Sequence, residues 1–120
     1  MYQFFRTETR MLSKELVAAS AEPLILSLLA NGESYGYAII QEIKARSQDR
    51  IQWTDGMLYP VLHRMEREGW IESHWDETEA GRRRKYYRLK KEGKRALKEQ
   101  SEQWMMVHSV LSGLLEGKHV

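Results

Sequence analysis

Apolar residues recur at helical spacing in the first part of the chain, and this pattern predicts two successive helices. The first expected helix covers residues 12–30. Pro23 lies within it and lacks an amide hydrogen, so it should either kink the helix or mark a fresh first turn. Asn-Gly at 31–32 is a typical helix stop, and Ser34 can cap a second helix over residues 35–45.

The second expected helix has one apolar face and an unusual first turn. Its buried positions should be Tyr37, Ile43 and either Ile39 or Ile40. Gly36 lowers helix propensity in the first turn, so we expect another backbone to approach closely there.

A third helix follows, and a short strand over residues 51–53 is expected before it. Thr54 can cap its first turn, Asp55 suits its positive N-terminal end, and Gly69 ends it. The inward stripe should contain Leu58, Leu62 and Met65 with Val61 beside them, and the residues mainly outside it are Tyr59, His63, Arg64 and Arg67.

Two segments rich in aromatic and branched residues come next and suit the strands of a hairpin. The strands are expected at residues 70–75 and 85–89, with an acidic, turn-like stretch at 76–81. Tyr86 and Tyr87 alternate across the second strand, so one should be core and the other exposed. We expect core positions for Trp70 and Trp75.

The last segment, residues 90–115, is expected to be one long helix. Residues alternately four and three apart form a heptad-like seam: Leu97, Ser101, Trp104, His108, Leu111 and Leu115. Val107, Val110 and Leu114 widen its apolar face. The predicted fold class is therefore mainly α with a small β-hairpin, a winged helix-turn-helix followed by a long C-terminal dimerisation helix.

This pattern divides the 120 residues into four parts. Residues 1–11 are expected to be a flexible N-terminal extension, or an arm that packs on a partner. Residues 12–89 form the expected DNA-binding domain, residues 90–116 the dimerisation helix and residues 117–120 a tail.

The charge is unevenly placed, although the net charge is only +2. Residues 82–98 hold ten Lys or Arg and a single acid, Glu92, so the rest of the chain is net acidic. A solvated helix face would explain the basic residues of 90–98 equally well. The run from Arg82 to Lys85 on a hairpin favours a phosphate-rich partner, because local charge sets the potential that a polyanion meets.

Other classes of function find little support in the sequence. The chain has no cysteine, so disulfides and thiolate metal sites are excluded, in keeping with a cytoplasmic protein. No apolar run approaches the roughly 20 residues of a membrane-spanning helix, and no signal peptide is recognisable. The four histidines lack metal-ligand spacing and no glycine-rich phosphate loop occurs, so we expect no enzyme activity, metal or cofactor.

Three stretches together resemble the PadR family of bacterial transcriptional regulators. They are YGYAI at 35–39, GMLYPVLHRMEREGWI at 56–71 and RRRKYYRL at 82–89. The likeness extends from about Lys14 to Leu115, and the short chain is similar to the small subgroup of LmrR-type multidrug-sensing repressors. Lys90 departs from the threonine with which the family usually caps the last helix, and the extension before Met11 is atypical.

The resemblance implies a homodimer on a roughly palindromic DNA operator, with the C-terminal helix packed on the partner's N-terminal helix. The implied DNA-binding residues are Tyr35, Thr54, Tyr59, His63, Arg64, Arg83, Arg84 and Lys85. The implied dimer interface comprises Leu97, Trp104, Val107, Leu111, Leu114 and Leu115. Arginine, lysine and tyrosine can all bond phosphate oxygens, whereas His63 could read a base edge or remain in solvent. Arg67 is expected to be a surface residue.

Trp104 has two competing interpretations. It could simply belong to the dimer seam, or it could stack on a planar drug between the subunits, as the likeness implies. In the second case Leu16, Ser101 and His108 would line the same effector pocket. The sequence thus predicts a dimeric repressor that a small planar or apolar effector releases from DNA. The alternative is a winged-helix module that binds a protein and does not read DNA directly.

Overall fold

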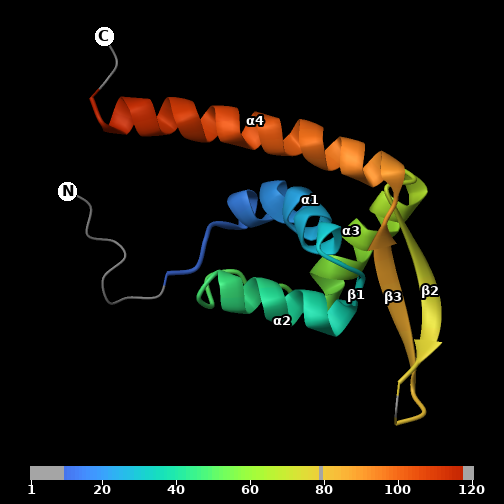
Figure 1. Cartoon of the computed structure of the whole chain (residues 1–120). Helices are drawn as coiled ribbons and strands as arrows, with labels where there is room; N and C mark the ends of the chain where they lie inside the picture. Colours follow the sequence, from blue (N-terminus) through green and yellow to red (C-terminus); the bar gives the residue numbers. More distant parts are fainter. Residues whose placement is uncertain (1–9, 79, 118–120) are drawn as a thin grey trace.

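The computed structural model describes residues 10–78 and 80–117 and shows four helices and a three-stranded antiparallel sheet (Figure 1). The elements are α1 (Lys14–Ala30), β1 (Ser34–Tyr35), α2 (Gly36–Arg46), α3 (Asp55–Arg67), β2 (Ile71–Glu77), β3 (Arg83–Leu89) and α4 (Lys91–Leu115). The predicted fold class is confirmed, with a third strand added to the hairpin. Residues 1–9 of the expected extension and 118–120 of the expected tail lie outside the described residues.

Helix α1 begins at a serine cap and continues through its proline. The Ser13 hydroxyl oxygen accepts from the Leu16 amide at 3.2 Å. The helix includes Pro23, so no fresh helix starts there. It ends at Asn31, and Gly32 follows with a φ of 142°, a conformation that L side chains rarely adopt.

The short strand β1 replaces the start that was predicted for the second helix. Ser34 and Tyr35 pair with Tyr87 and Tyr86 of β3, so Ser34 does not cap α2, and Tyr35 precedes the helix. Long-range pairing thus overrides the local capping preference. Ile39 and Ile43 are buried as expected. Tyr37 is 67% exposed, so its predicted burial is wrong.

Helix α3 follows the prediction closely. Thr54 caps it, with its hydroxyl oxygen accepting from the Met57 amide at 3.3 Å. Leu58, Leu62 and Met65 are all buried. The preceding residues 51–53 form no strand, although Ile51 and Trp53 are buried and extend the core.

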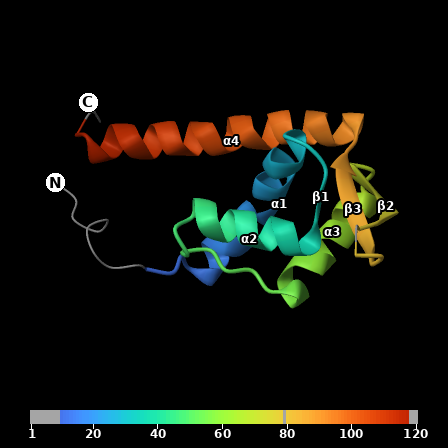
Figure 2. The same ribbon diagram turned by 60° about the horizontal axis from the view of Figure 1, so that its bottom comes forward.

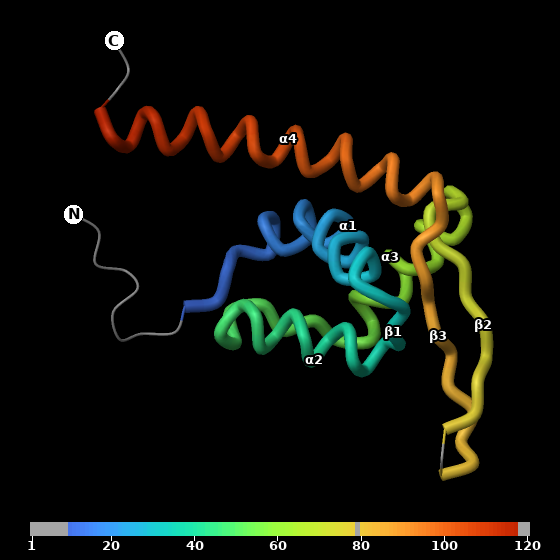
Figure 3. Tube along the Cα trace, viewed as in Figure 1, coloured from blue at the N-terminus to red at the C-terminus, as the bar shows by residue number. Residues whose placement is uncertain are grey.

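Strands β2 and β3 form the hairpin, which Figure 3 shows projecting away from the helices. Each strand extends two residues farther toward the tip than expected, because the strand pairing continues out to the pair formed by Glu77 and Arg83. Tyr87 is buried and Tyr86 is half-buried, so Tyr87 is the one of the two tyrosines that occupies the core. Trp70 packs against the core, but Trp75 is 56% exposed because it lies out along the hairpin.

Helix α4 is anchored to the sheet at its first turn. The Lys90 amide donates to the Trp70 carbonyl at 2.9 Å, and no side chain caps the helix. A Cβ at position 93 would overlap that same carbonyl oxygen, so glycine is required for this approach. The helix then runs along one side of the molecule, with its C-terminal half away from the sheet (Figures 1 and 2).

The far half of α4 leaves large apolar side chains uncovered on more than one side of the helix. Seven of them are 53–64% exposed: Met105, Met106, Val107, Val110, Leu111, Leu114 and Leu115. Among the described helices, none combines the length and the apolar character needed to cross a membrane.

The core contains two buried polar atoms without a hydrogen-bond partner among the described residues, Trp53 Nε1 and the Tyr87 hydroxyl. Tyr87 is 1% exposed, and its hydroxyl has no hydrogen-bond partner among the described residues. Burial raises the pKa of Tyr87 from its ordinary value of 10.0 to about 12, with further contributions from Glu66 and Tyr59.

The substitution Tyr87→Phe should therefore leave stability at neutral pH unchanged or raise it by up to about 1 kcal/mol, because an unpaired hydroxyl is removed. The raised pKa means that the folded state holds the phenolic proton more tightly than the unfolded state. The free energy of unfolding should thus be intact below pH 10 and fall as the pH rises from 10 to about 12. Urea unfolding across this range should show a smaller alkaline loss in the variant. An equal loss in both proteins would contradict the assignment to Tyr87.

Candidate nucleic-acid interface

One side of α3 is free of the rest of the protein. Helical spacing places Gly56, Pro60, His63 and Arg67 opposite the buried stripe, and all four are exposed. Arg67 forms no hydrogen bond or ion pair within the described part of the chain. This outward face therefore presents an imidazole and a guanidinium to solvent, groups that can bond base edges and phosphates.

Tyr59 joins α3 to the start of α2. It is half-buried, and its hydroxyl and ring lie where a Cβ of residue 36 would be, with Cζ only 2.9 Å from that point. The close approach predicted at Gly36 therefore exists, but it is made by a tyrosine side chain and not by backbone. The Tyr59 and His63 rings lie 6.3 Å apart at 42°. Glycine at 36 thus allows the two helices of the helix-turn-helix to meet.

Arg64 lies on another side of α3 from His63 and Arg67. Its Nε donates to Glu22 of α1 at 3.0 Å, and the other oxygen of that carboxylate accepts from Gln100 of α4 at 3.3 Å. The Glu22 carboxylate therefore connects α1 with both α3 and α4. The Arg64 guanidinium is occupied by a carboxylate 42 residues away in the sequence, a pairing that helical spacing alone could not predict.

The hairpin carries the basic run at its outer end. Arg82 and Arg83 are exposed, and Arg84 and Lys85 are half-buried. Strand alternation places Arg83 and Lys85 on one face of this narrow ribbon and Arg84 on the other. Both faces of the hairpin end therefore carry basic side chains.

These cations lie close to aromatic rings. The Arg84 guanidinium is 4.0 Å from the centre of the Tyr35 ring, and the Arg83 guanidinium is 4.8 Å from that of Trp75. The Lys85 ammonium is 5.5 Å from the Tyr87 ring. Tyr35 is thereby brought next to the wing, which its position in the sequence did not indicate.

Sequence reasoning gave too little weight to two residues of this surface. Arg67 was expected to be an ordinary surface residue, although its spacing of four from His63 puts it on the outward face of α3. Trp75 was expected in the core. Its position three residues before the hairpin turn could have indicated exposure, because the outer part of a wing has no second layer above it.

The predicted effector residues are spread along α4 and at the start of α1. Leu16 is 41% exposed, and Trp104 is 36% exposed. The Ser101 hydroxyl donates to the Lys98 carbonyl at 3.1 Å, and His108 Nε2 lies 3.5 Å from the Ser112 hydroxyl. These side chains are accessible in the single chain.

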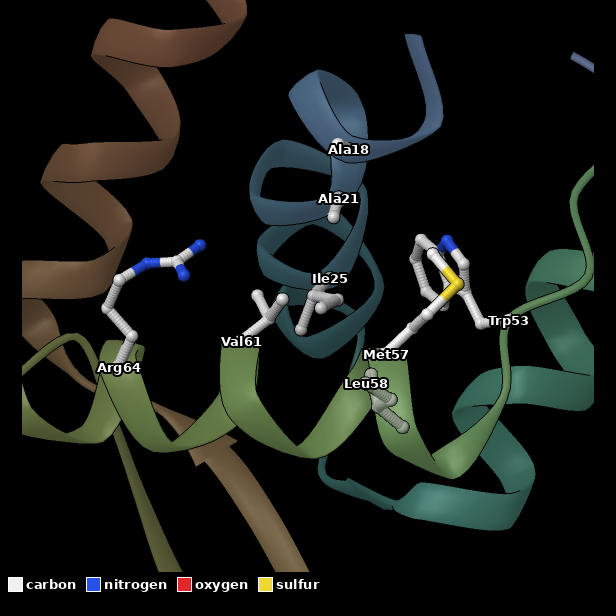
Figure 4. A pocket seen from close by; sticks show the side chains of 8 residues that line it. All are labelled: Ala18, Ala21, Ile25, Trp53, Met57, Leu58, Val61 and Arg64. Carbon is white, nitrogen blue, oxygen red and sulfur yellow. The ribbon is translucent and has the colours of Figure 1, made fainter. Parts of the chain in front are cut away.

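A cavity of about 210 Å³ lies elsewhere, between α1 and α3. Figure 4 shows Ala18, Ala21 and Ile25 of α1 facing Val61 of α3, with Trp53 toward one end and Arg64 at the other. Apolar side chains form most of its wall.

Comparison with known proteins places this geometry in context. The family model of the transcriptional regulator PadR-like family matches residues 25–99. A Lysinibacillus sphaericus protein named Uncharacterized protein X is 32% identical over 107 residues, which is 89% of this chain and 98% of that protein.

Solved structures show the same arrangement. A transcriptional regulator from Clostridium thermocellum matches with a TM-score of 0.77 and 31% identity, covering 85% of this chain and 96% of its own. A PadR family transcriptional regulator from Eggerthella lenta gives a TM-score of 0.72 and 34% identity, with 85% and 87% covered. A PadR-like regulator from Bacillus cereus gives 0.75 and 28%, with 85% and 97% covered.

Proposed function

This chain belongs to the PadR-like family of transcriptional regulators, and we propose that it binds a roughly palindromic operator as a homodimer and acts as an effector-released repressor in the cytoplasm. Members of this family act as DNA-binding transcriptional regulators and not as enzymes. The operator symmetry, the dimer and the effector are the finer parts of this proposal, and each rests on its own observation.

The observation that carries DNA binding is the pairing of two exposed basic surfaces. The outward face of α3 presents His63 and Arg67, and the wing presents Arg83, Arg84 and Lys85. A helix in the major groove with a wing on neighbouring phosphates would engage both. Tyr59 and Thr54 would act mainly by holding α3, since Tyr59 is half-buried and the Thr54 oxygen caps the helix. Arg64 would likewise hold α3 in place through Glu22.

Removing two wing charges with Arg84→Ala and Lys85→Ala should weaken binding to a short duplex and lower its salt dependence. Each lost phosphate contact reduces the slope of log affinity against log salt by about one, so we expect a reduction of about two. Fluorescence anisotropy over a range of salt concentrations measures both quantities.

The matched control removes the same number of charges from the last turn of α2, with Lys44→Ala and Arg46→Ala. These two substitutions should leave the slope of log affinity against log salt unchanged. An unchanged slope in the wing variant would exclude the wing contact. A wild-type protein that binds no duplex at low salt would favour a protein-interaction module.

The side of α4 that carries Val107, Leu111 and Leu114 supports the dimer. Exposed apolar patches of this extent are rare on monomers and mark interaction surfaces. Leu111, Leu114 and Leu115 lie on one side of the helix with Val107 and Trp104, and Leu97 continues that side toward the core. Packing against Leu16 and the rest of α1 in a second copy would cover it.

A glutamate on this side of α4 should disrupt the dimer, because it would place an unpaired charge in an apolar interface. We expect Leu111→Glu to sediment as a monomer at a concentration where the wild type is a dimer, and to bind DNA more weakly. Ser109→Glu adds the same charge on the opposite side of α4 and should remain dimeric. Identical sedimentation of both variants would contradict the proposed interface.

An effector site would form where two copies of α4 meet. Trp104 is partly exposed in the single chain, with Ser101 and His108 about one turn to either side. An indole face between subunits would suit a planar apolar or cationic molecule. Such a molecule would release DNA only if it bound one dimer geometry more tightly than the other.

A planar cationic dye should therefore quench the fluorescence of Trp104 in the dimer. The chain has four tryptophans, so a Trp104→Phe variant is needed to assign the change. We expect most of the quenching to disappear in that variant. Equal quenching in both proteins would place the dye elsewhere and remove the Trp104 pocket from the proposal.

A further inference from the structure

The wing holds its arginines in an uncommon way. Cross-strand pairing places an acid opposite each of three arginines of β3: Glu77 opposite Arg83, Asp76 opposite Arg84 and Glu72 opposite Arg88. Opposite charges at such positions normally attract. Only at the base of the hairpin does the ion pair form, with Arg88 Nε 2.7 Å from the Glu72 carboxylate.

At the outer end, the arginines lie against aromatic rings. The Arg84 guanidinium is 4.0 Å from the centre of the Tyr35 ring, although Asp76 is its cross-strand neighbour. The Asp76 carboxylate accepts instead from the Glu77 amide at 2.8 Å. Within the described residues, Arg84 forms no ion pair with any carboxylate.

The Tyr35 ring is itself held in place. The Tyr86 ring meets it edge-on, with centres 5.4 Å apart and planes at 71°. The Tyr86 ring in turn stacks on the His74 ring, with ring centres 5.8 Å apart and planes at 19°. His74 Nε2 lies 2.9 Å from a Glu33 oxygen, so the row is tied to the segment that follows α1.

The second arginine has an equivalent support on the opposite face of the ribbon. The Arg83 guanidinium is 4.8 Å from the Trp75 ring centre, and no ion pair with Glu77 forms. Trp75 is 56% exposed, so the indole does not serve as core packing. Contact with Arg83 gives this exposed ring a role.

A ring and a carboxylate hold an arginine with different consequences. A carboxylate occupies the N–H donors and cancels the charge. An aromatic face attracts the cation through its quadrupole and leaves the N–H groups at the guanidinium edge free to bond a phosphate. Ring support therefore orders the side chain and preserves its charge.

We propose that Tyr35 and Trp75 are positioning residues that hold Arg84 and Arg83 ready for phosphate contact. The proposal rests on the DNA-binding function proposed above. It assigns to Tyr35 a role for the ring face, whereas the family likeness implied direct contact with DNA, for which the hydroxyl would be the natural group.

Double-mutant cycles test this with a labelled random-sequence duplex at low salt. Tyr35→Leu should weaken binding roughly two- to fivefold, the range expected for an exposed cation–π contact, and should have little further effect when Arg84 is already alanine. Trp75→Leu should show the same dependence on Arg83. Tyr35→Phe keeps the ring and should bind like the wild type.

The crossed pairs provide matched controls. Tyr35→Leu with Arg83→Ala, and Trp75→Leu with Arg84→Ala, should be additive because these residues lie on opposite faces of the ribbon. Thermal unfolding of each variant identifies any general loss of structure, which would affect all pairs alike.

Two results would overturn the positioning role. One is additivity in the matched pairs, or equal coupling in matched and crossed pairs. The other is a loss in Tyr35→Phe as large as in Tyr35→Leu, which would assign the effect to the hydroxyl. Both presuppose that the wild type binds the duplex in a salt-dependent manner. Failure of that binding would instead count against the proposed function.

Discussion

Burial of Leu58, Leu62 and Met65 is the constraint on which the candidate interface depends. These side chains are at most 2% exposed, and together they fix the rotation of α3 about its own axis. A helix rotated by one residue would bring a different set of side chains to the surface. Because the apolar stripe leaves little freedom, His63 and Arg67 face outward, while Arg64 turns toward Glu22 and α4. The Tyr59 ring over Gly36 adds a second restraint, which sets the position of α3 against α2.

The position of the wing follows from the same core. Tyr87 of β3 belongs to the same buried cluster as the apolar stripe of α3, and the β1 pairing attaches the start of α2 to β3. The basic hairpin is therefore connected to the helix-turn-helix by packing and by backbone hydrogen bonds. This arrangement places four consecutive basic residues, Arg82 to Lys85, on one projection of a chain whose net charge is only +2, although β2 of the same hairpin carries Asp76 and Glu77.

The sequence predicted those features that depend on neighbouring residues. The Thr54 cap, the buried stripe of α3 and the hairpin follow from local spacing, and each is confirmed. Features that depend on distant parts of the chain were missed. Strand β1 has two residues and exists only because β3 lies beside it. The Arg64 pairing with Glu22 requires α1 and α3 to be placed first.

Exposure was also hard to predict where an element extends past the layer that would cover it. Trp75 and Tyr37 are aromatic residues that the sequence pattern assigned to the core, yet the side chains of both are more than half exposed. Conversely, the long α4 was correctly predicted as a helix, and two residues of its predicted seam, Leu111 and Leu115, are uncovered in the single chain.

Backbone amide NMR of the wild-type protein, titrated with duplex DNA, tests whether α3 and the wing form one DNA-binding surface. The largest shift changes should cluster on the outward face of α3, at the start of α2 and along the outer wing, and the last turn of α2 should stay unchanged. Changes confined to α4, or spread evenly over the protein, would contradict a common DNA-binding surface formed by α3 and the wing.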